Sequence, residues 1–438
     1  MPANTYAPAL SAAEHRKMLT RAALAATIGT TIEWYDFFLY GTATGLVFGA
    51  LFFPNDNPLV ATLNAFGVYA VGFVARPIGA AIFGHFGDRI GRKSTLIATL
   101  MLMGVATVLV GVVPTYATIG IWGAVILTIL RFIQGVGVGG EWGGSVLMSM
   151  EWAGSKSSRG LAASWPQMGV PAGLFIANLA VLAFSAWSGD AFLTWGWRIP
   201  FLLSIILIGV GLWIRLGVEE SPTFKRMASE NRIEKTPALT VMRRHPREII
   251  LSALARMGEQ APFYIFTAFV FSYGVGTLKL SRDLLLISVM AASVLSLVTV
   301  PLSGHLSDRF GRKRVYMFGA VLTGLYGFAY VGLLNTTAPV LVFIAIFVSL
   351  IPHDIMYGPQ AALIAECFPG PLRYSGASIG YQLASVIAGG PAPLIVAWLL
   401  AQYRSGWVIA IFILICAVIS LIATAMLPDN TDRNFEES

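Results

Sequence analysis

Charged residues are scarce in this chain. Asp, Glu, Lys and Arg together make up 12% of its 438 residues, while hydrophobic residues make up 56%, and the mean hydropathy is +0.73. A soluble chain usually has about a quarter of its residues charged. The shortage excludes a water-soluble globular protein of this size, because too few polar side chains remain to cover its surface.

Cysteine is nearly absent as well, since Cys367 and Cys416 are the two in the chain and each lies in an apolar run. This count excludes a disulfide framework, a CxxC redox motif and a thiolate zinc site, so we expect neither a metal nor a cofactor. The phosphate-loop pattern GxxxxGK[ST] is missing, which argues against an ATP-driven pump. We find no motif for a catalytic dyad with a nucleophile, and we expect no enzyme.

The chain is rich in long apolar runs, and these predict twelve transmembrane helices. The runs lie near residues 21–51, 58–86, 94–113, 117–149, 158–186, 196–217, 247–277, 283–306, 314–334, 337–367, 373–402 and 404–427. Each reaches the length of about 18 residues that a transmembrane helix needs. Backbone groups in hydrocarbon must be paired within the segment, which favours helices. We therefore predict an all-α polytopic protein in the lipid bilayer.

One long polar stretch, 218–246, separates the first six predicted helices from the last six. The predicted units are an N-terminal half at 1–217, a central loop at 218–246, and a C-terminal half at 247–438 that ends in a short tail. This division assigns six helices to each half.

The net charge of +7 is distributed between the apolar segments instead of on one soluble face, so no nucleic-acid partner is expected. Under the twelve-helix topology most Lys and Arg fall on one side of the membrane. The loops on the other side hold few: Arg198, Lys279, Arg282 and Arg404. Because Lys and Arg favour the cytoplasmic side, both termini and the central loop are predicted to be cytoplasmic.

The two halves share a repeated motif. The segment GHFGDRIGRK at 84–93 recurs as GHLSDRFGRK at 304–313, and each copy follows the second predicted helix of its half. A second repeat pairs a glutamate and an arginine of the first half with the same residue types in the second. Two parallel repeats of six helices form the plan of the major facilitator fold.

The loop GDRxGRK after the second helix resembles the signature of the major facilitator superfamily. More specific runs are IEWYDF at 32–37, ARPIG at 75–79, RFIQG at 131–135, GGEWGG at 139–144 and WGWRIPF at 195–201. Together they resemble the bacterial metabolite:proton symporters, which include carriers of shikimate, 2-oxoglutarate, citrate and proline/betaine. Arg256-x-x-Glu259 and His353-Asp354 resemble the shikimate carriers most.

This resemblance implies a proton-coupled symporter that imports a small organic anion by alternating access, as a multi-pass protein of the bacterial inner membrane. The expected partners are the organic anion and protons, and we expect a monomer. Two alternatives stay open, a proton-coupled exporter of drugs or metabolites and a carrier of a zwitterion such as proline or betaine.

Ionisable side chains within membrane helices are costly and are functional candidates. Glu33, Asp36 and Tyr40 share one face of the first helix through their i, i+3, i+7 spacing. Asp36 lies about 15 residues into that helix from one side, and Arg131 about 14 into the fourth from the other. At 1.5 Å per residue both lie near the midplane, so we expect them to pair. The family resemblance assigns proton coupling to Asp36 with Arg131, and a static ion pair is the alternative.

The fourth helix has two distinct faces. Its polar stripe includes Arg131, Gln134 and Glu141, and the opposite side carries glycines at 135, 139 and 143 that predict a close helix contact. Glu141, together with Glu33 of the first helix, is an alternative proton site.

Arg256 and Glu259 share a face of the seventh helix. An arginine there would hold a substrate carboxylate through two hydrogen bonds, and an internal salt bridge with Glu259 is the alternative. His353 is predicted to titrate, to bind substrate or to be a neutral histidine. Tyr357 and Gln360 extend its stripe. The remaining substrate candidates are Asp354, Tyr40, Gln134, Gln167, Tyr381, Gln382 and Arg76.

The repeated loops and their partners are predicted gating elements. They comprise Asp88, Arg89, Arg92, Asp308, Arg309 and Arg312, with Glu151, Arg159, Glu366 and Arg373 from the second repeat. Their charges are expected to cap helix ends and to form breakable ion pairs at the cytoplasmic interface between the halves.

Overall fold

The structure is a computed structural model that describes residues 12–56, 58–153, 158–217, 220, 229 and 237–431. Most of the predicted central loop, 218–246, lies outside the described residues, as do both ends of the chain.

The first half of the chain forms a series of helices. In order they are α1 (Ala12–Ala43), η1 (Thr44–Phe48), α2 (Gly49–Phe52), α3 (Pro58–Ile90), α4 (Arg92–Val112), α5 (Tyr116–Ile119), α6 (Trp122–Ala153), α7 (Arg159–Gln167), α8 (Gly169–Ser188), η3 (Gly189–Leu193), α9 (Arg198–Leu202) and α10 (Ser204–Leu216). Short elements such as η1 and α2 continue the long helices, so the half contains six membrane crossings.

The second half repeats this plan. Its elements are α12 (Pro237–Arg244), α13 (Pro246–Ala255), α14 (Met257–Tyr264), η4 (Ile265–Phe269), η5 (Ser272–Thr277), α15 (Arg282–Phe310), α16 (Arg312–Asn335), α17 (Pro339–Ala365), η6 (Gly370–Leu372), α18 (Arg373–Ala384), η7 (Ser385–Gly389), α19 (Pro391–Tyr403) and α20 (Trp407–Met426).

Eleven helical segments of the described chain are long and apolar enough to cross a membrane. The remaining crossing is the seventh, 246–277, which is interrupted at Arg256 and passes into π-helical turns after Tyr264. Pro262 lies inside α14 and lacks a backbone donor, which weakens regular helical pairing there. The all-α fold with twelve helices in two six-helix halves is as the sequence predicts.

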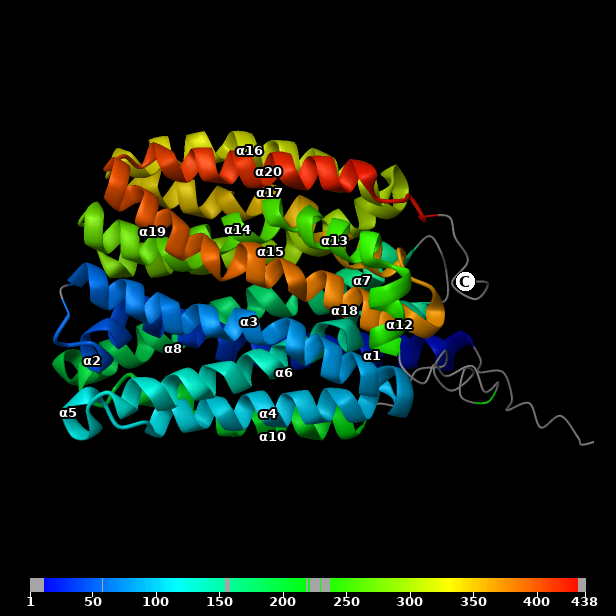
Figure 1. Ribbon diagram of the computed structural model, residues 1–438, viewed down its shortest axis with the longest axis horizontal. Coiled ribbons are helices and arrows are strands. Elements are labelled where there is room, and N and C mark those ends of the chain that lie inside the picture. Colours follow the sequence, from blue (N-terminus) through cyan, green and yellow to red (C-terminus); the bar gives the residue numbers. More distant parts are fainter. Residues whose placement is uncertain are drawn as a thin grey trace, which may run out of the picture.

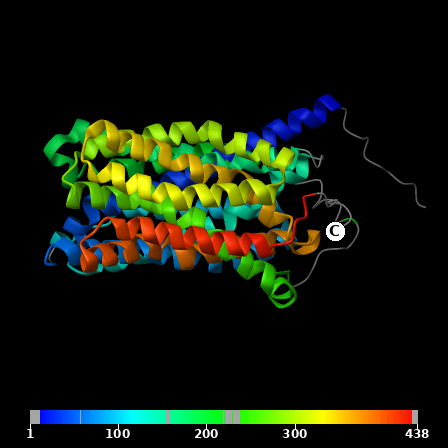
Figure 2. The same ribbon diagram turned by 90° about the horizontal axis from the view of Figure 1, so that it is seen from above.

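The long helices run side by side along the long axis of the molecule (Figure 1). The start of α1 and the end of α20 lie at the same end of the bundle, which we call the termini side, and the opposite end is the far side. Figure 2 shows the first turns of α1 projecting beyond the other helices on the termini side.

Large apolar side chains cover the outside of the bundle. On α10 they include Ile205, Ile206 and Trp213, whose side chain is 78% exposed, and Val298 lies exposed on α15. Continuous apolar surface of this kind marks contact with lipid. The chain is therefore a multi-pass membrane protein.

The glycine face of α6 forms the predicted close helix contact, and the structure shows that its partner is α3. A Cβ atom added at Gly135 would lie 2.0 Å from the Gly72 carbonyl oxygen, and one at Gly139 would lie 2.0 Å from that of Arg76. Backbones this close leave no room for a side chain. Gly143 instead faces Ser378 of α18 in the second half. This contact places the polar face of α6 toward α1 and α4.

Candidate functional site

A small cavity lies between the two halves. The first half contributes Trp34 from α1 and Val170 from α8 to its lining. The second half contributes Arg256, Glu259, Gln260, Phe263, Tyr264, His353, Tyr357 and Tyr381. Four predicted substrate residues of the seventh and tenth crossings (Arg256, Glu259, His353 and Tyr357) are thus brought together with a fifth, Tyr381 of α18. We call this space the central cavity.

Glu259 is the centre of the polar contacts in the central cavity. Its carboxylate oxygens lie 3.2 Å from Arg256 Nη2 and 3.1 Å from His353 Nε2, and it accepts a hydrogen bond of 2.9 Å from Gln360 Nε2. Arg256 also donates from Nε to Gln360 Oε1 at 3.1 Å and stacks over the Tyr381 ring. The internal salt bridge that the sequence left open is therefore formed in this structure.

Asp354 lies behind this group. Its Oδ1 is 2.9 Å from His353 Nδ1, and its Oδ2 accepts a hydrogen bond from Thr299 of α15. Asp354 does not line the central cavity. Its carboxylate instead points toward α15, and the expectation that it contacts substrate stays a prediction.

Several other substrate candidates join the halves instead of lining the cavity. Gln167 accepts a hydrogen bond from Trp142 Nε1 at 2.9 Å and donates to the Tyr357 carbonyl at 3.2 Å. Gln382 Nε2 donates to the Val138 carbonyl at 3.4 Å. Gln360 is buried beneath the cavity, held by its contacts with Glu259 and Arg256. Gln167 and Gln382 hold helices of the two halves together, whereas the contacts of Gln360 with Arg256 and Glu259 lie within the second half.

The predicted ion pair between Asp36 and Arg131 is not formed. Asp36 Oδ1 accepts a hydrogen bond of 2.5 Å from Ser204 of α10, and no carboxylate of the described chain pairs with Arg131. Arg131 Nη1 donates to Gln134 at 3.3 Å, and Gln134 donates to Thr107 at 2.7 Å. The depth argument placed both groups at one level, but rotation of α1 turns Asp36 toward α10.

Two buried arginines, Arg76 and Arg131, both lie over one aromatic ring, that of Phe37. The guanidinium carbon of each is 4.2 Å from the centre of the Phe37 ring. Arg131 also lies over the rings of Tyr40 and Tyr69, at 4.4 and 4.6 Å. Tyr40 and Gln134 are thus neighbours of Arg131 and do not line the central cavity.

Arg76 reaches across to the second half. Its Nη1 donates to the Tyr264 hydroxyl and to Ser385 Oγ, each at 3.4 Å. Nε and Nη2 of Arg76, and Nη2 of Arg131, are buried and have no hydrogen-bond acceptor among the described residues. Both guanidinium groups therefore carry positive charge that no described carboxylate balances.

Glu33 and Glu141 share one partner that the sequence analysis missed. Arg215 Nη2 lies 2.6 Å from Glu141 Oε1 and 3.4 Å from Glu33 Oε1. The sequence pattern placed Arg215 with the cytoplasmic positive charges, because it stands near the end of the sixth apolar run. The structure shows it 5% exposed and directed into the bundle. One feature of the sequence could have indicated this position: a full turn of apolar residues precedes Arg215, which is typical of an arginine inside the membrane helix.

The repeated loops cap helices of the opposite half. Asp88 at the end of α3 accepts hydrogen bonds from the backbone nitrogen (3.1 Å) and hydroxyl (2.7 Å) of Ser375, near the start of α18. Asp308 at the end of α15 accepts from the backbone nitrogens of Gly160 and Leu161, both at 2.9 Å, at the start of α7. Carboxylates at helix N-termini are favourable because the first backbone N–H groups lack partners.

Ion pairs complete the contact on the termini side. Arg312 lies 2.8 Å from both Asp308 and Glu366, and Arg159 lies 3.9 Å from Glu366. Burial raises the pKa of the Glu366 carboxyl, and the Arg312 guanidinium opposes that shift. Arg92 is fully buried, and Arg373 donates to the Phe368 carbonyl at 3.2 Å. Of the residues in the second predicted repeat, Glu366 and Arg159 thus take part in this network.

Two predicted gating residues lie apart from this network. Arg89 and Arg309 are exposed on the termini side, and Arg89 Nη1 lies 3.3 Å from His85 Nε2. The side chain of Glu151 lies outside the described residues. The exposed pair follows from the repeat itself, since the residue after each aspartate points away from the interface.

The far side is open by comparison. A vestibule with a volume of about 840 Å³ lies between the ends of the second, seventh, ninth, eleventh and twelfth crossings. Its lining includes Thr62, Tyr273, Asn335 and Arg404. The structure is thus closed on the termini side and hollowed on the far side.

Known proteins resemble this chain over nearly its whole length. The inner membrane metabolite transport protein YhjE of Escherichia coli K12 is 40% identical over 407 residues, which cover 91% of this chain and 92% of that protein. The shikimate transporter of the same organism is 40% identical over 418 residues, 94% of each chain. A proline/betaine transporter of Escherichia coli K12 is 29% identical over 425 residues.

Solved structures show the same fold. The proton:xylose symporter XylE, bound to 6-bromo-6-deoxy-D-glucose, superimposes with a TM-score of 0.73 at 21% identity, covering 97% of this chain and 98% of that one. The family pattern of the Major Facilitator Superfamily matches residues 28–373 and 277–436. This chain is therefore a transporter of small molecules, not an enzyme, and it belongs to the Major Facilitator Superfamily.

Proposed function

We propose that this transporter imports a small organic anion together with protons. The observation that carries the proposal is the pair Arg76 and Arg131, two buried guanidinium groups beside the interface between the halves without a carboxylate partner in the described chain. Burying a charged side chain is costly unless it is compensated. An anionic substrate supplies that compensation when it binds.

The aromatic rings around the two arginines offset part of the cost. A cation over an aromatic face gains about 0.5–2 kcal/mol, and the centre of the Phe37 ring lies 4.2 Å from both guanidinium carbons. The three guanidinium nitrogens without acceptors remain available for charge-assisted hydrogen bonds, which suit carboxylates because the two groups match in geometry. A cationic substrate would be repelled by the same site.

Arg256 supplies a third contact from the second half. It is held by Glu259 in the empty carrier, at 3.2 Å. A substrate carboxylate that competes for Arg256 releases Glu259, which then faces His353. Substrate thus binds between residues 1–217 and 247–438, and these halves rock around it while the contacts of Asp88 and Asp308 open and close the termini side.

The relatives guide the choice of substrate. One of them is a shikimate transporter at 40% identity, and a neighbour in structure is a proton:xylose symporter. Arg256 lines the central cavity with the hydroxyl and amide groups of Tyr357, Tyr381 and Gln260, which are suitable partners for a carboxylate that also carries hydroxyl groups. We therefore place shikimate first among the ligands to be tested.

The proton role that sequence analysis assigned to Asp36 with Arg131 stays a prediction. Asp36 is linked to Ser204, and Arg131 is linked to Gln134. The inward proton gradient of bacteria makes import the favoured direction, with both termini in the cytoplasm.

Uptake into proteoliposomes tests the proposal. Purified protein is reconstituted, a pH gradient that is acid outside is imposed, and labelled shikimate is compared with citrate, 2-oxoglutarate, proline and betaine. We expect an acid to accumulate, and an uncoupler to abolish accumulation. Lys279→Ala, which removes an exposed cation of the far-side loop, is the control and should behave as wild type.

Two outcomes contradict the proposal. Accumulation of proline or betaine without any acid would favour the zwitterion carrier. Accumulation only when the gradient is acid inside would favour an exporter.

A further inference from the structure

A second group of buried charges lies inside the first half, away from the central cavity. Glu33 of α1, Glu141 of α6 and Arg215 of α10 meet there, and their exposed fractions are 1%, 1% and 5%. Neither Glu33 nor Glu141 lines the central cavity, although Trp34, the neighbour of Glu33, does. We call these three residues the Arg215 cluster.

The Arg215 cluster has one positive group for two acids. Glu141 has the closer contact with Arg215, at 2.6 Å, and also accepts from Ser145 Oγ at 2.8 Å and Thr30 Oγ1 at 3.4 Å. Glu33 Oε1 lies 3.4 Å from Arg215, while its Oε2 is buried and has no hydrogen-bond donor among the described residues. With both acids ionised, the cluster would carry an unbalanced buried negative charge.

The two carboxylates are also close neighbours, because an Oε1 atom of each contacts the same nitrogen, Arg215 Nη2. Two ionised carboxylates repel each other, and such a contact becomes favourable when one of them carries a proton. The geometry therefore provides a place for one proton, on the free side of Glu33.

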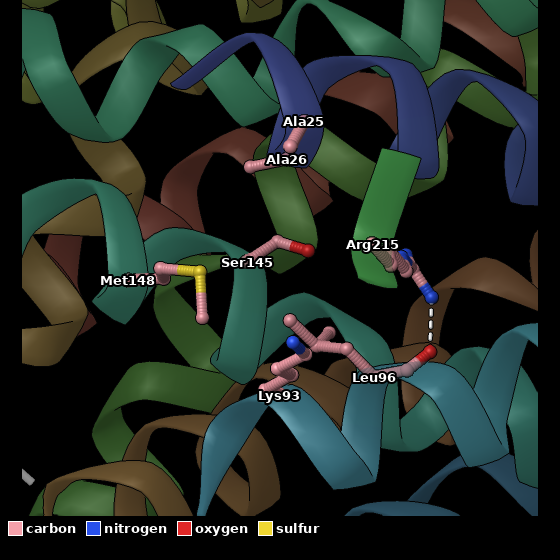
Figure 3. A pocket seen from close by; sticks show the side chains of 7 residues that line it. All are labelled: Ala25, Ala26, Lys93, Leu96, Ser145, Met148 and Arg215. Atoms are coloured by element: carbon pink, nitrogen blue, oxygen red, sulfur yellow. Dashed lines mark hydrogen bonds between the residues drawn. The ribbon is translucent and has the colours of Figure 1, made fainter. Parts of the chain in front are cut away.

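A cavity connects the Arg215 cluster toward the termini side. Figure 3 shows its lining, with Arg215 of α10 and Ser145 of α6 at the cluster and Lys93 at the start of α4. Its volume of about 20 Å³ for water-sized spheres exceeds the roughly 10–15 Å³ that one water needs. Ser145, which donates to Glu141, therefore borders a space that can hold a water.

Other charged and titratable groups surround the cluster. Lys93 of α4 is half-buried at the cavity, and its Nζ donates to the Leu216 carbonyl at 2.8 Å. Tyr374 of α18 interacts electrostatically with both acids and with Arg92 of α4, and its hydroxyl donates to the Gly140 carbonyl at 2.7 Å. Glu220 accepts from the backbone nitrogens of Arg92 and Lys93.

We propose that the Arg215 cluster binds the coupled proton and exchanges it with the termini side through this cavity, while the substrate uses the central cavity. In the binding step, a hydronium ion transfers its proton to one carboxylate oxygen of Glu33 or Glu141, forming an O–H bond and leaving water. Release reverses this step. The inference rests on the proposed proton coupling, and it assigns the proton and the substrate to different routes.

Arg215 sets the strength of the site through its approach to α1. A Cβ atom added at Gly29 would lie 2.5 Å from Arg215 Nη2, so the glycine leaves room for the guanidinium one turn before Glu33. Gly29→Ala therefore disturbs the cluster without removing a charge. Weakening the cation beside an acid favours the protonated acid.

Infrared difference spectroscopy tests proton binding without transport. Purified protein in detergent is titrated with base, and the carbonyl band of protonated carboxyl groups is recorded. We expect this band to disappear from the wild-type spectrum as the pH rises. In the double variant Glu33→Gln/Glu141→Gln the band should be absent at every pH. Gly29→Ala should lose it at higher pH. Asp36→Asn and Glu248→Gln, an acid outside the cluster, should retain it.

Transport by the single variants completes the test. We expect Glu33→Gln and Glu141→Gln to keep equilibrium exchange of substrate, while accumulation driven by a pH gradient falls at least about tenfold. An unchanged band in the double variant, or full accumulation by both single variants, would overturn the inference.

The outcomes separate this inference from the proposed function. A carrier that takes up substrate without protons, yet shows the band of the cluster, would overturn the proton coupling and leave only proton binding by the cluster. Loss of the band in Asp36→Asn with retention in the double variant would place the proton at Asp36 and sink the inference alone. Thermal unfolding midpoints near that of wild type confirm that each variant is folded.

Discussion

At the scale of single residues, the positions of Arg76 and Arg131 distinguish this carrier. Their guanidinium groups are fully buried, face the ring of Phe37 from 4.2 Å, and have no described carboxylate as partner. Arginine differs from lysine here because its planar group stacks on rings and still offers hydrogen-bond donors at its edge. The charge is kept in place by packing and is left for a substrate to neutralise.

Replacing Arg131 with lysine is expected to weaken substrate binding. The ammonium group keeps the charge but loses the stacking on Phe37 and the paired donors, at a cost of about 1.5–3 kcal/mol, or about 10- to 100-fold in affinity. Concentration dependence of exchange measures this change. Arg404→Lys, in the far-side vestibule, serves as the control. If Arg131→Lys binds substrate with unchanged affinity, Arg131 is not part of the anion site.

A second residue-scale prediction concerns Glu259. Because Glu259 holds Arg256 at 3.2 Å and also contacts His353, Glu259→Gln should change the pH dependence of substrate affinity more than the affinity at low pH. Binding is measured across pH by thermal shift, since a ligand that binds the folded protein raises its melting temperature. A pH profile parallel to that of wild type would leave Glu259 a structural partner.

At the scale of elements, the contact between α3 and α6 positions both anion-site arginines. Arg76 lies on α3 and Arg131 on α6, and the glycine face of α6 brings the two backbones together at Gly135 and Gly139. Close packing of small residues drives helix association in lipid. The distance between the two guanidinium groups therefore depends on an uncharged helix contact, the one that Gly135 and Gly139 of α6 make with α3.

Gly135→Ala should destabilise the protein, because its Cβ would lie 2.0 Å from the Gly72 carbonyl oxygen, a backbone atom. Overpacking of this kind costs about 1–3 kcal/mol. The thermal unfolding midpoint in detergent measures the loss. Gly209→Ala is the matched control, since nothing lies within 4 Å of its added Cβ. Equal midpoints for the two variants would show that α3 and α6 separate freely.

At the scale of the whole molecule, two aspartates hold the halves together on the termini side. Asp88 and Asp308 each receive two hydrogen bonds from a helix start in the other half. Each loop belongs to one half and its partner helix to the other. Opening the termini side must therefore break both contacts.

Asp308→Ala should shift the carrier toward opening on the termini side by at least about tenfold, since hydrogen bonds to a charged group are worth about 1.5–3 kcal/mol. Cys367 reports the change. Burial raises the pKa of its thiol to about 12, and the thiolate is the reactive form. Alkylation at neutral pH should be slow in wild type, accelerate as pH rises, and be faster in the variant.

The measurement uses a Cys416→Ser background, with Asp283→Ala on the far side as control. Asp283 is exposed and pairs with its neighbour Arg282 at 3.9 Å. Equal alkylation rates for Asp308→Ala and the control would show that the Asp308 contact does not hold the termini side closed.

The orientation of the molecule is also a prediction at this scale. If the termini side is cytoplasmic, a cysteine placed at Ser229 should resist a membrane-impermeant reagent added to intact cells, whereas one at Asn335, exposed on the far side, should react. The reverse pattern would contradict the orientation that the distribution of Lys and Arg predicts.

The sequence by itself determined the elements of this protein. The number and the positions of the helices follow from the apolar runs. In hydrocarbon the backbone groups of each run must be hydrogen-bonded within the run, and a helix achieves this. The glycine seam of α6 follows from spacing along one helix, which is local geometry, and the repeated motif marks Asp88 and Asp308 as capping residues without specifying the helices that they cap. The depth of a residue in the membrane is likewise local, through the rise of 1.5 Å per residue.

The choice of charge partners was decided by the tertiary structure alone. Asp36 and Arg131 share a level, yet Asp36 contacts Ser204, and Arg215 extends inward to Glu33 and Glu141. A side chain at a known depth still points in a direction set by how its helix is rotated and crossed by its neighbours. That rotation results from the packing of all twelve helices, which no single segment of the sequence specifies.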